Sequence, residues 1–133
     1  MIWIVASMKW IMLVSGALTC TMLYATIAPQ AALRGTFGDT LHGPIAEIVV
    51  RNWGVLIGLM GAMLIYGAFN IAARPLVLTV AGLSKATFIA LILVIGRPFL
   101  GYQAGVAVVS DLIQVSLFLG YLLATRSSVK AAV

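Results

Sequence analysis

The fold is decided by three consecutive segments: LVLTVAGLSKATFIALILVIG (residues 76–96), RPFLGYQ (97–103) and AGVAVVSDLIQVSLFLGYLLAT (104–125). The outer two are apolar runs, and each is long enough to cross the roughly 30 Å hydrocarbon core of a bilayer as a helix. Each run carries one charged residue near its middle, Lys85 in the first and Asp111 in the second. The stretch therefore predicts a transmembrane helical hairpin with a charge in each arm.

The composition of the whole 133-residue chain agrees with a membrane protein. It is 63% hydrophobic and 8% charged, with a mean hydropathy of +1.17. A soluble domain carries about 25% charged residues. In lipid, backbone polar groups must be paired inside the structure, so only helices or closed barrels can span it. The apolar runs are continuous and lack the alternation of barrel strands. We expect an all-α polytopic protein surrounded by membrane lipids.

Charges and prolines divide the chain into four predicted helices within a single transmembrane domain, residues 1–133: about 10–28, 44–72, 76–96 and 104–125. The first run follows Lys9 and stops at Pro29. It is longer than the 7–15 residue core of a signal peptide, which favours a retained helix. Pro44 suits the first position of the second helix. The breaks at 74–75 and 97–103 are short, so the sequence predicts a four-transmembrane-helix antiparallel bundle.

The topology follows from basic residues in the flanks and loops. Four spans place both termini on one side of the membrane. That side carries four basic residues, Lys9, Arg74, Arg126 and Lys130, and the opposite side carries three, Arg34, Arg51 and Arg97. Because basic residues concentrate on the cytoplasmic side, we expect both termini to be cytoplasmic, in a bacterial inner membrane.

Lys85 and Asp111 are expected to form a direct ion pair. Either charge alone costs about 2.5–3.5 kcal/mol at the centre of a spanning helix. Measured from the connecting turn, Lys85 lies about 18 Å before Arg97 and Asp111 about 12 Å after Gln103. The offset is about one helical turn, which a lysine stem can cover. Gln114 lies one turn beyond Asp111 and extends a polar seam between the two helices.

Two interpretations of this seam stay open. An ionisable residue inside a membrane points by default to function, which here would be a proton or ion relay or a site for a polar headgroup. Alternatively, Lys85 and Asp111 neutralise each other and only fix the helix register. Buried pairs of this kind can specify a structure while adding little net stability.

A second group of polar residues lies at the start of the second predicted helix. Glu47 and Arg51 are four residues apart, and His42 precedes them in a glycine-containing loop. Together they could form the mouth of a pocket on the non-cytoplasmic side. The alternative is a solvent-exposed pair, which contributes a few tenths of a kcal/mol on a helix surface.

The same helix carries a stripe of small residues: Gly54, Gly58, Gly61 and Ala62. Small residues let two helices approach closely and gain dispersion contacts that lipid cannot match. The stripe is expected to serve helix packing, either inside the chain or against a partner.

The sequence argues against several function classes. Basic residues are scattered, whereas nucleic-acid binding needs a basic stripe. The lone Cys20 and lone His42 form no metal-ligand spacing, and no histidine lies in a span to hold haem, so no metal and no cofactor is expected. The sequence shows no nucleophile–base pair that would suggest an enzyme. We therefore expect a structural or accessory membrane protein, as a homo-oligomer or with another membrane protein. A small transporter or ion pathway through Lys85 and Asp111 is the alternative.

Overall fold

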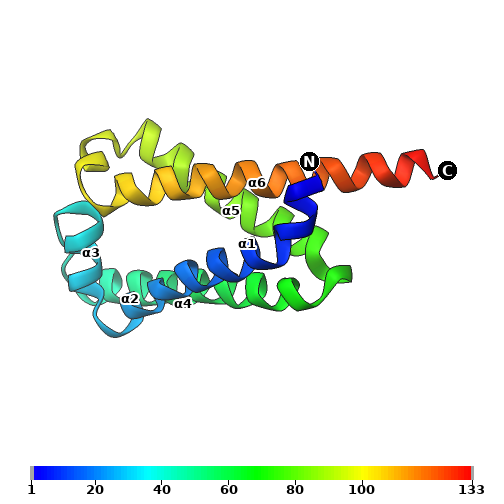
Figure 1. Cartoon of the computed structure of the whole chain (residues 1–133). Coiled ribbons are helices and arrows are strands. Elements are labelled where there is room, and N and C mark those ends of the chain that lie inside the picture. The colour runs from blue at the N-terminus through cyan, green and yellow to red at the C-terminus, as the bar shows by residue number, and fades with distance from the viewer. Residues whose placement is uncertain (1, 133) are drawn as a thin grey trace.

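The computed structural model describes residues 2–132, which form helices joined by short turns (Figure 1). Four helical segments are long and apolar enough to cross a membrane: Ile2–Ile27, Pro44–Phe69, Ile71–Val94 and Gln103–Ala131. The expected all-α bundle of four membrane-spanning helices is confirmed, and the protein is integral to a membrane.

The first span is divided by a short 3-10 segment, and further short helices lie at the connections. In chain order the elements are α1 (Ile2–Cys20), η1 (Thr21–Leu23), α2 (Tyr24–Ile27), α3 (Pro29–Phe37), α4 (Pro44–Phe69), η2 (Ile71–Ala73), α5 (Arg74–Val94), η3 (Arg97–Gly101) and α6 (Gln103–Ala131).

The first helix begins at Ile2 rather than at the predicted residue 10, so Lys9 lies inside α1. Its ammonium group lies 4.8 Å from the ring centre of Phe69 and 5.9 Å from that of Trp10. A cation over an aromatic ring is attracted by the negative ring face. Lys9 therefore has partners within the bundle, and its charge does not end the helix.

The polar stretch between the first two spans lies outside the four predicted helices, but it contains α3. Pro29 occupies the first turn of this helix, where its missing N–H costs nothing. The helix ends at Gly38, whose φ of 74° lies in the left-handed region that glycine adopts freely. A Cβ at Gly38 would overlap the ring of Tyr102, so the end of α3 packs directly on the start of α6.

The turn between α4 and α5 depends on Arg74, which the sequence placed in the short break between two predicted helices. The residue is only 8% exposed. Its guanidinium donates to the carbonyl oxygens of Gly67 (2.9 Å) and Ala68 (2.7 Å). These carbonyls belong to the last turn of α4 and have no partner within the helix. Arg74 thus caps α4, which ends at Phe69 instead of residue 72, while α5 ends at Val94 instead of 96.

The last helix extends past the predicted end at Thr125 and reaches Ala131. In Figure 1 this C-terminal part projects beyond the other helices. Ser127 and Ser128 each donate to the carbonyl oxygen four residues earlier, so their hydroxyls are satisfied within the helix. The polar tail is therefore helical.

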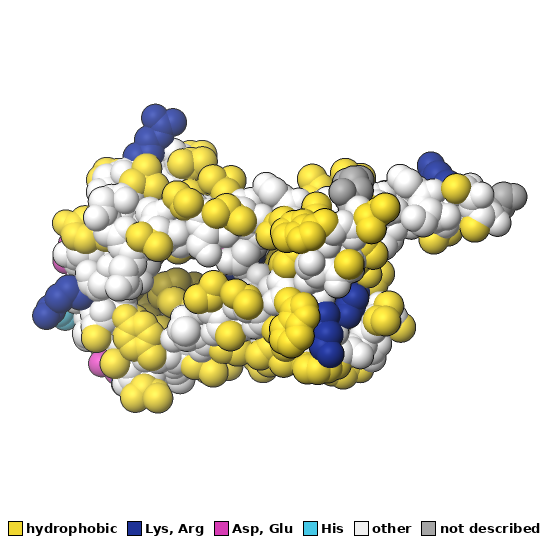
Figure 2. Space-filling model, in the orientation of Figure 1, with side chains coloured by type: hydrophobic (Ala, Val, Ile, Leu, Met, Phe, Trp, Pro, Cys, Tyr) yellow, Lys and Arg dark blue, Asp and Glu magenta, His cyan; other side chains and the backbone are white. Residues whose placement is uncertain are grey.

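The bundle consists of two tightly packed pairs, α1 with α4 and α5 with α6, which meet along smaller α1–α6 and α4–α5 contacts. One apolar core joins all four spans: Met8, Met12, Leu64, Ala68, Leu78 and Phe118. A second lies within the α5–α6 pair: Ile89, Ile92, Ala104 and Val108. Figure 2 shows basic side chains at the two ends of the bundle and on the C-terminal extension, with hydrophobic side chains between the ends.

The glycine stripe of α4 faces the first span within the same chain. Gly54 lies against Thr26, Gly58 against Leu23, and Gly61 against α1. A Cβ at Gly61 would stand 2.7 Å from both Cys20 N and Gly16 O, so the two backbones are in direct contact there. Ala62 does not belong to this face. It is exposed, because the next residue along a helix is rotated away from the contact.

Replacing Gly61 with alanine should weaken the α1–α4 contact. The added methyl group would meet backbone atoms that cannot rotate away, so we expect the free energy of unfolding to fall by about 1–3 kcal/mol. Gly82→Ala is the matched control, since no atom lies within 4 Å of its added Cβ. It should be neutral or stabilising by up to about 1 kcal/mol. Unfolding in mixed micelles, followed by far-ultraviolet circular dichroism, measures both; equal stability of the two variants would contradict the close approach.

Candidate functional site

The two charges inside the α5–α6 hairpin form a direct ion pair. Lys85 Nζ lies 2.7 Å from Asp111 Oδ1, and the lysine donates a hydrogen bond across this distance. The side chains are only 11% and 15% exposed. The one-turn offset in depth between the two residues is therefore bridged by the lysine stem, as expected for a long side chain leaning along its helix.

Thr19 of α1 is a third member of this cluster, and the sequence did not single it out. Lys85 Nζ lies 3.4 Å from Thr19 Oγ1, which itself donates to the backbone carbonyl of Ser15 at 2.7 Å. The ammonium group thus contacts α1 as well as α6. A signal existed: Ser15 and Thr19 are spaced four apart in an apolar run, and both are buried. Hydroxyls at that spacing share a helix face.

The electrostatic consequence is a neutral cluster at the junction of the two helix pairs. Each charge alone would be costly in the membrane interior. Together they cancel, and the hydroxyl of Thr19 supplies an additional oxygen to the lysine. Because Lys85 reaches both Asp111 and Thr19, one side chain connects α5, α6 and α1.

Gln114 lies farther along α6 and takes part in a separate contact. Its Nε2 donates to Ser110 Oγ at 2.9 Å, one turn back on the same helix. The residue is 7% exposed, and its Oε1 is buried without a hydrogen-bond partner among the described residues. Unpartnered buried polar atoms are rare in folded proteins. Gln114 lines a hollow between α1 and α6 together with Ser15 of α1, so the polar seam predicted between α5 and α6 turns toward α1 at this residue.

The residues expected at a pocket mouth lie at the surface. Glu47 and Arg51 are 3.7 Å apart, with side chains 51% and 45% exposed. Arg51 also donates to the carbonyl oxygen of Thr26 at 2.5 Å, which ties the start of α4 to α2. His42 instead shares a hydrogen bond of 3.1 Å with Thr40 in the preceding loop. The three predicted residues are thus divided between an exposed ion pair and a loop contact.

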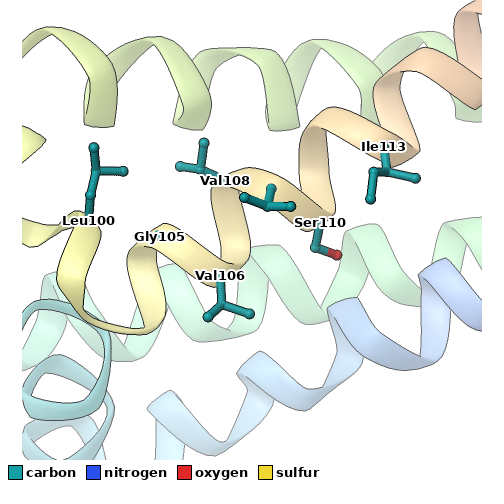
Figure 3. Close-up of a pocket in the computed structure, with 7 residues that line it drawn as sticks. Leu100, Gly105, Val106, Val108, Ser110 and Ile113 are labelled. Carbon is teal, nitrogen blue, oxygen red and sulfur yellow. The ribbon is translucent and has the colours of Figure 1, made fainter.

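Two adjoining cavities follow α6. One, of about 710 Å³, is lined by η3 and the first half of α6. The other, of about 420 Å³, lies between α1 and α6. They share Ser110 and Ile113 in their linings. Figure 3 shows Ser110 and Val106 directed from α6 to the side on which α1 runs, whereas Leu100 points toward α5. The two hollows therefore lie next to each other along α6.

Metal-binding groups do not gather in the folded chain. Among residues 2–132 no cluster of three or more His, Cys, Asp or Glu side chains could hold a metal ion.

Comparisons of the chain with protein-family models, curated proteins and solved structures find no match.

The ion pair can be tested by removing one charge and then both. Lys85→Met leaves Asp111 buried and unpaired, so we expect a loss of about 3–5 kcal/mol in the free energy of unfolding. The double variant Lys85→Met with Asp111→Leu should recover most of this loss, because no bare charge remains. Glu47→Gln, which removes an exposed pair, should change stability by less than about 1 kcal/mol. Unfolding titrations in micelles measure all three; an additive double variant would show that the two charges do not interact.

Proposed function

We propose that the protein is a non-catalytic protein of a bacterial inner membrane. It works as a homo-oligomer or as a subunit of a larger membrane complex. The observation that carries this proposal is the closed charge cluster. Lys85 is satisfied by Asp111 and Thr19 within the chain, at the junction of the two helix pairs. The charges inside the bundle therefore already have a structural role, which is to hold α1, α5 and α6 together.

The outer surface supports the same proposal. Only 22–28% of the residues in the most apolar window of each span are buried inside the chain. Large hydrophobic side chains are exposed on every span, including Leu18, Leu59, Leu83 and Leu119. Each helix keeps most of its circumference for lipid or for other transmembrane helices. Such surfaces suit lateral assembly, where packing rather than water exclusion drives association.

The proposed orientation has both termini in the cytoplasm. Lys9, Arg74, Arg126 and Lys130 lie on the side of the termini. The opposite side carries three basic residues together with Asp39 and Glu47. The distribution of basic residues favours the terminal side as the cytoplasmic one.

Native mass spectrometry of gently extracted protein tests the assembly. We expect more than one polypeptide per particle, either several copies of this chain or a fixed ratio with another membrane protein. As a control, membranes that carry two differently tagged copies are mixed before extraction. The two tags should not appear in one particle, which shows that the oligomer does not form during extraction. A single copy in every mild detergent would overturn the proposal.

The alternative function, a proton or ion pathway, is favoured by one specific observation. The first span changes from α-helix to the 3-10 segment Thr21–Leu23 two residues after Thr19, and Thr19 is the residue that contacts Lys85. Transporter sites commonly lie at such helix irregularities, and short 3-10 stretches inside helices often mark hinges.

Proteoliposomes containing a trapped pH-sensitive dye separate the two functions. If the protein is a structural subunit, liposomes that contain it should show the same proton flux as protein-free liposomes. If the protein is a proton pathway, the wild type and Glu47→Gln should both conduct protons. The double variant Lys85→Met with Asp111→Leu should then show only the flux of protein-free liposomes. Flux that persists in the folded double variant would exclude the pair from the pathway.

A further inference from the structure

The cavity of about 420 Å³ between α1 and α6 is apolar along most of its wall. Its lining contains Trp3, Trp10, Ile11, Val14, Ile113 and Leu117. A volume of this size falls in the range of small-molecule sites, which combine apolar walls with a few placed polar groups. Here the polar side chains that line it are those of Ser7, Ser15, Ser110 and Gln114.

Gln114 gives this cavity an unsatisfied hydrogen-bonding group. The residue is 7% exposed and lines the cavity, and its Oε1 has no partner among the described residues. Because Nε2 is used by Ser110, Oε1 is the atom left to accept a hydrogen bond, and a ligand reaches this buried oxygen when the side chain turns toward the groove.

The depth of Gln114 restricts what can reach it. Gln114 lies eleven residues after Gln103, the first residue of α6, which corresponds to about 16 Å along the helix. This is close to the middle of a hydrocarbon core about 30 Å thick. A phospholipid keeps its charged headgroup at the membrane surface and cannot bring it to this depth.

The lining also excludes a charged ligand, because it contains no Lys, Arg, Asp, Glu or His. A charge would be taken out of water with nothing to pair it. A hydroxyl group suits Gln114 Oε1, because it can donate the hydrogen bond that this acceptor lacks.

We propose that the groove between α1 and α6 binds a neutral, lipid-soluble molecule that carries a hydroxyl group, with this hydroxyl bonded to the amide of Gln114. The apolar part of the ligand lies along the walls and can continue past Ser110 and Ile113 into the adjoining cavity of about 710 Å³. Isoprenoid alcohols and quinols share this chemistry. The proposal is independent of the assembly state of the protein.

The role of Gln114 separates a binding site from a structural contact. If the amide were there to hold the fold, Gln114→Leu would destabilise the protein. If Gln114 instead serves a binding site, the wild-type protein carries a buried polar atom without a partner, which is unfavourable for folding. Gln114→Leu is therefore expected to unfold at an equal or higher denaturant concentration than the wild type while losing the hydroxyl-dependent binding.

Native mass spectrometry of the delipidated protein measures binding directly. The probes are a twenty-carbon isoprenoid alcohol, its methyl ether, and a short-tailed quinol. We expect a saturable one-to-one adduct with the alcohol and about threefold to tenfold weaker binding of the ether, which cannot donate a hydrogen bond. In Gln114→Leu the alcohol and the ether should bind equally. Ser116→Ala, which removes an exposed hydroxyl on another face of α6, should keep the wild-type preference.

A second pair of variants blocks the groove by volume. Ile113→Trp replaces an aliphatic side chain with a larger indole ring in the shared wall of both cavities. It should lower binding of every probe at least tenfold. Leu112→Trp is the matched control, because Leu112 is an exposed neighbour on the same helix and is not among the residues that line either cavity.

The outcomes are distinct. Displacement of the alcohol by the quinol identifies a site that accepts both sources of the hydroxyl, and failure of the quinol to compete restricts the site to the alcohol. Equal binding of alcohol and ether to the wild type overturns the proposal. So does unchanged binding in Ile113→Trp, which keeps the test decisive even where Gln114→Leu fails to fold.

Discussion

The contact between Lys85 and Asp111 is the interaction on which the rest of the bundle depends. Neither charge can face lipid alone, so their pairing fixes how far α5 and α6 slide past each other and which faces they turn inward. Because the same ammonium group reaches Thr19, the register of the α5–α6 hairpin is also linked to the position of α1. A single lysine thus relates three of the four spans to one another.

The other helix pair is held by different physics. The α1–α4 contact relies mainly on missing side chains, with Gly61 in backbone contact with α1, and Lys9 adds a cation–π contact to Phe69 at the end of α4. In a membrane this close approach replaces the hydrophobic effect, since lipid tails are as apolar as the side chains. The two pairs then meet over smaller contacts, at the shared core around Met12 and Phe118 and at Lys85. The groove between α1 and α6 occurs where that meeting is incomplete.

The sequence was sufficient for the architecture because hydropathy and span length report what a bilayer demands. It also singled out Lys85 and Asp111, since two opposite charges at similar depth in adjacent spans have few other partners. It missed Thr19 because a hydroxyl is tolerated in any helix and does not reveal its neighbour. It grouped Ala62 with the glycine stripe because Ala62 follows Gly58 by four residues, but the contact with α1 is made by the neighbouring Gly61 and Ala62 is exposed. The extra turns of α1 before residue 10 were missed because the cation–π partner of Lys9 is distant in sequence.

Polar side chains in the spans differ in whether their bonding capacity is used. Lys85, Asp111 and Thr19 satisfy one another, and Arg74 satisfies the carbonyls at the end of α4. These groups stabilise the fold and leave little chemistry for a ligand. Gln114 is different, since burial deprives its amide of water while the protein supplies only one partner. In a bilayer such a group gains from a hydroxyl delivered by the lipid phase, and the adjoining groove is where a molecule carrying one can lie. The same low dielectric that forces the charges together therefore makes the unpaired amide a point of recognition.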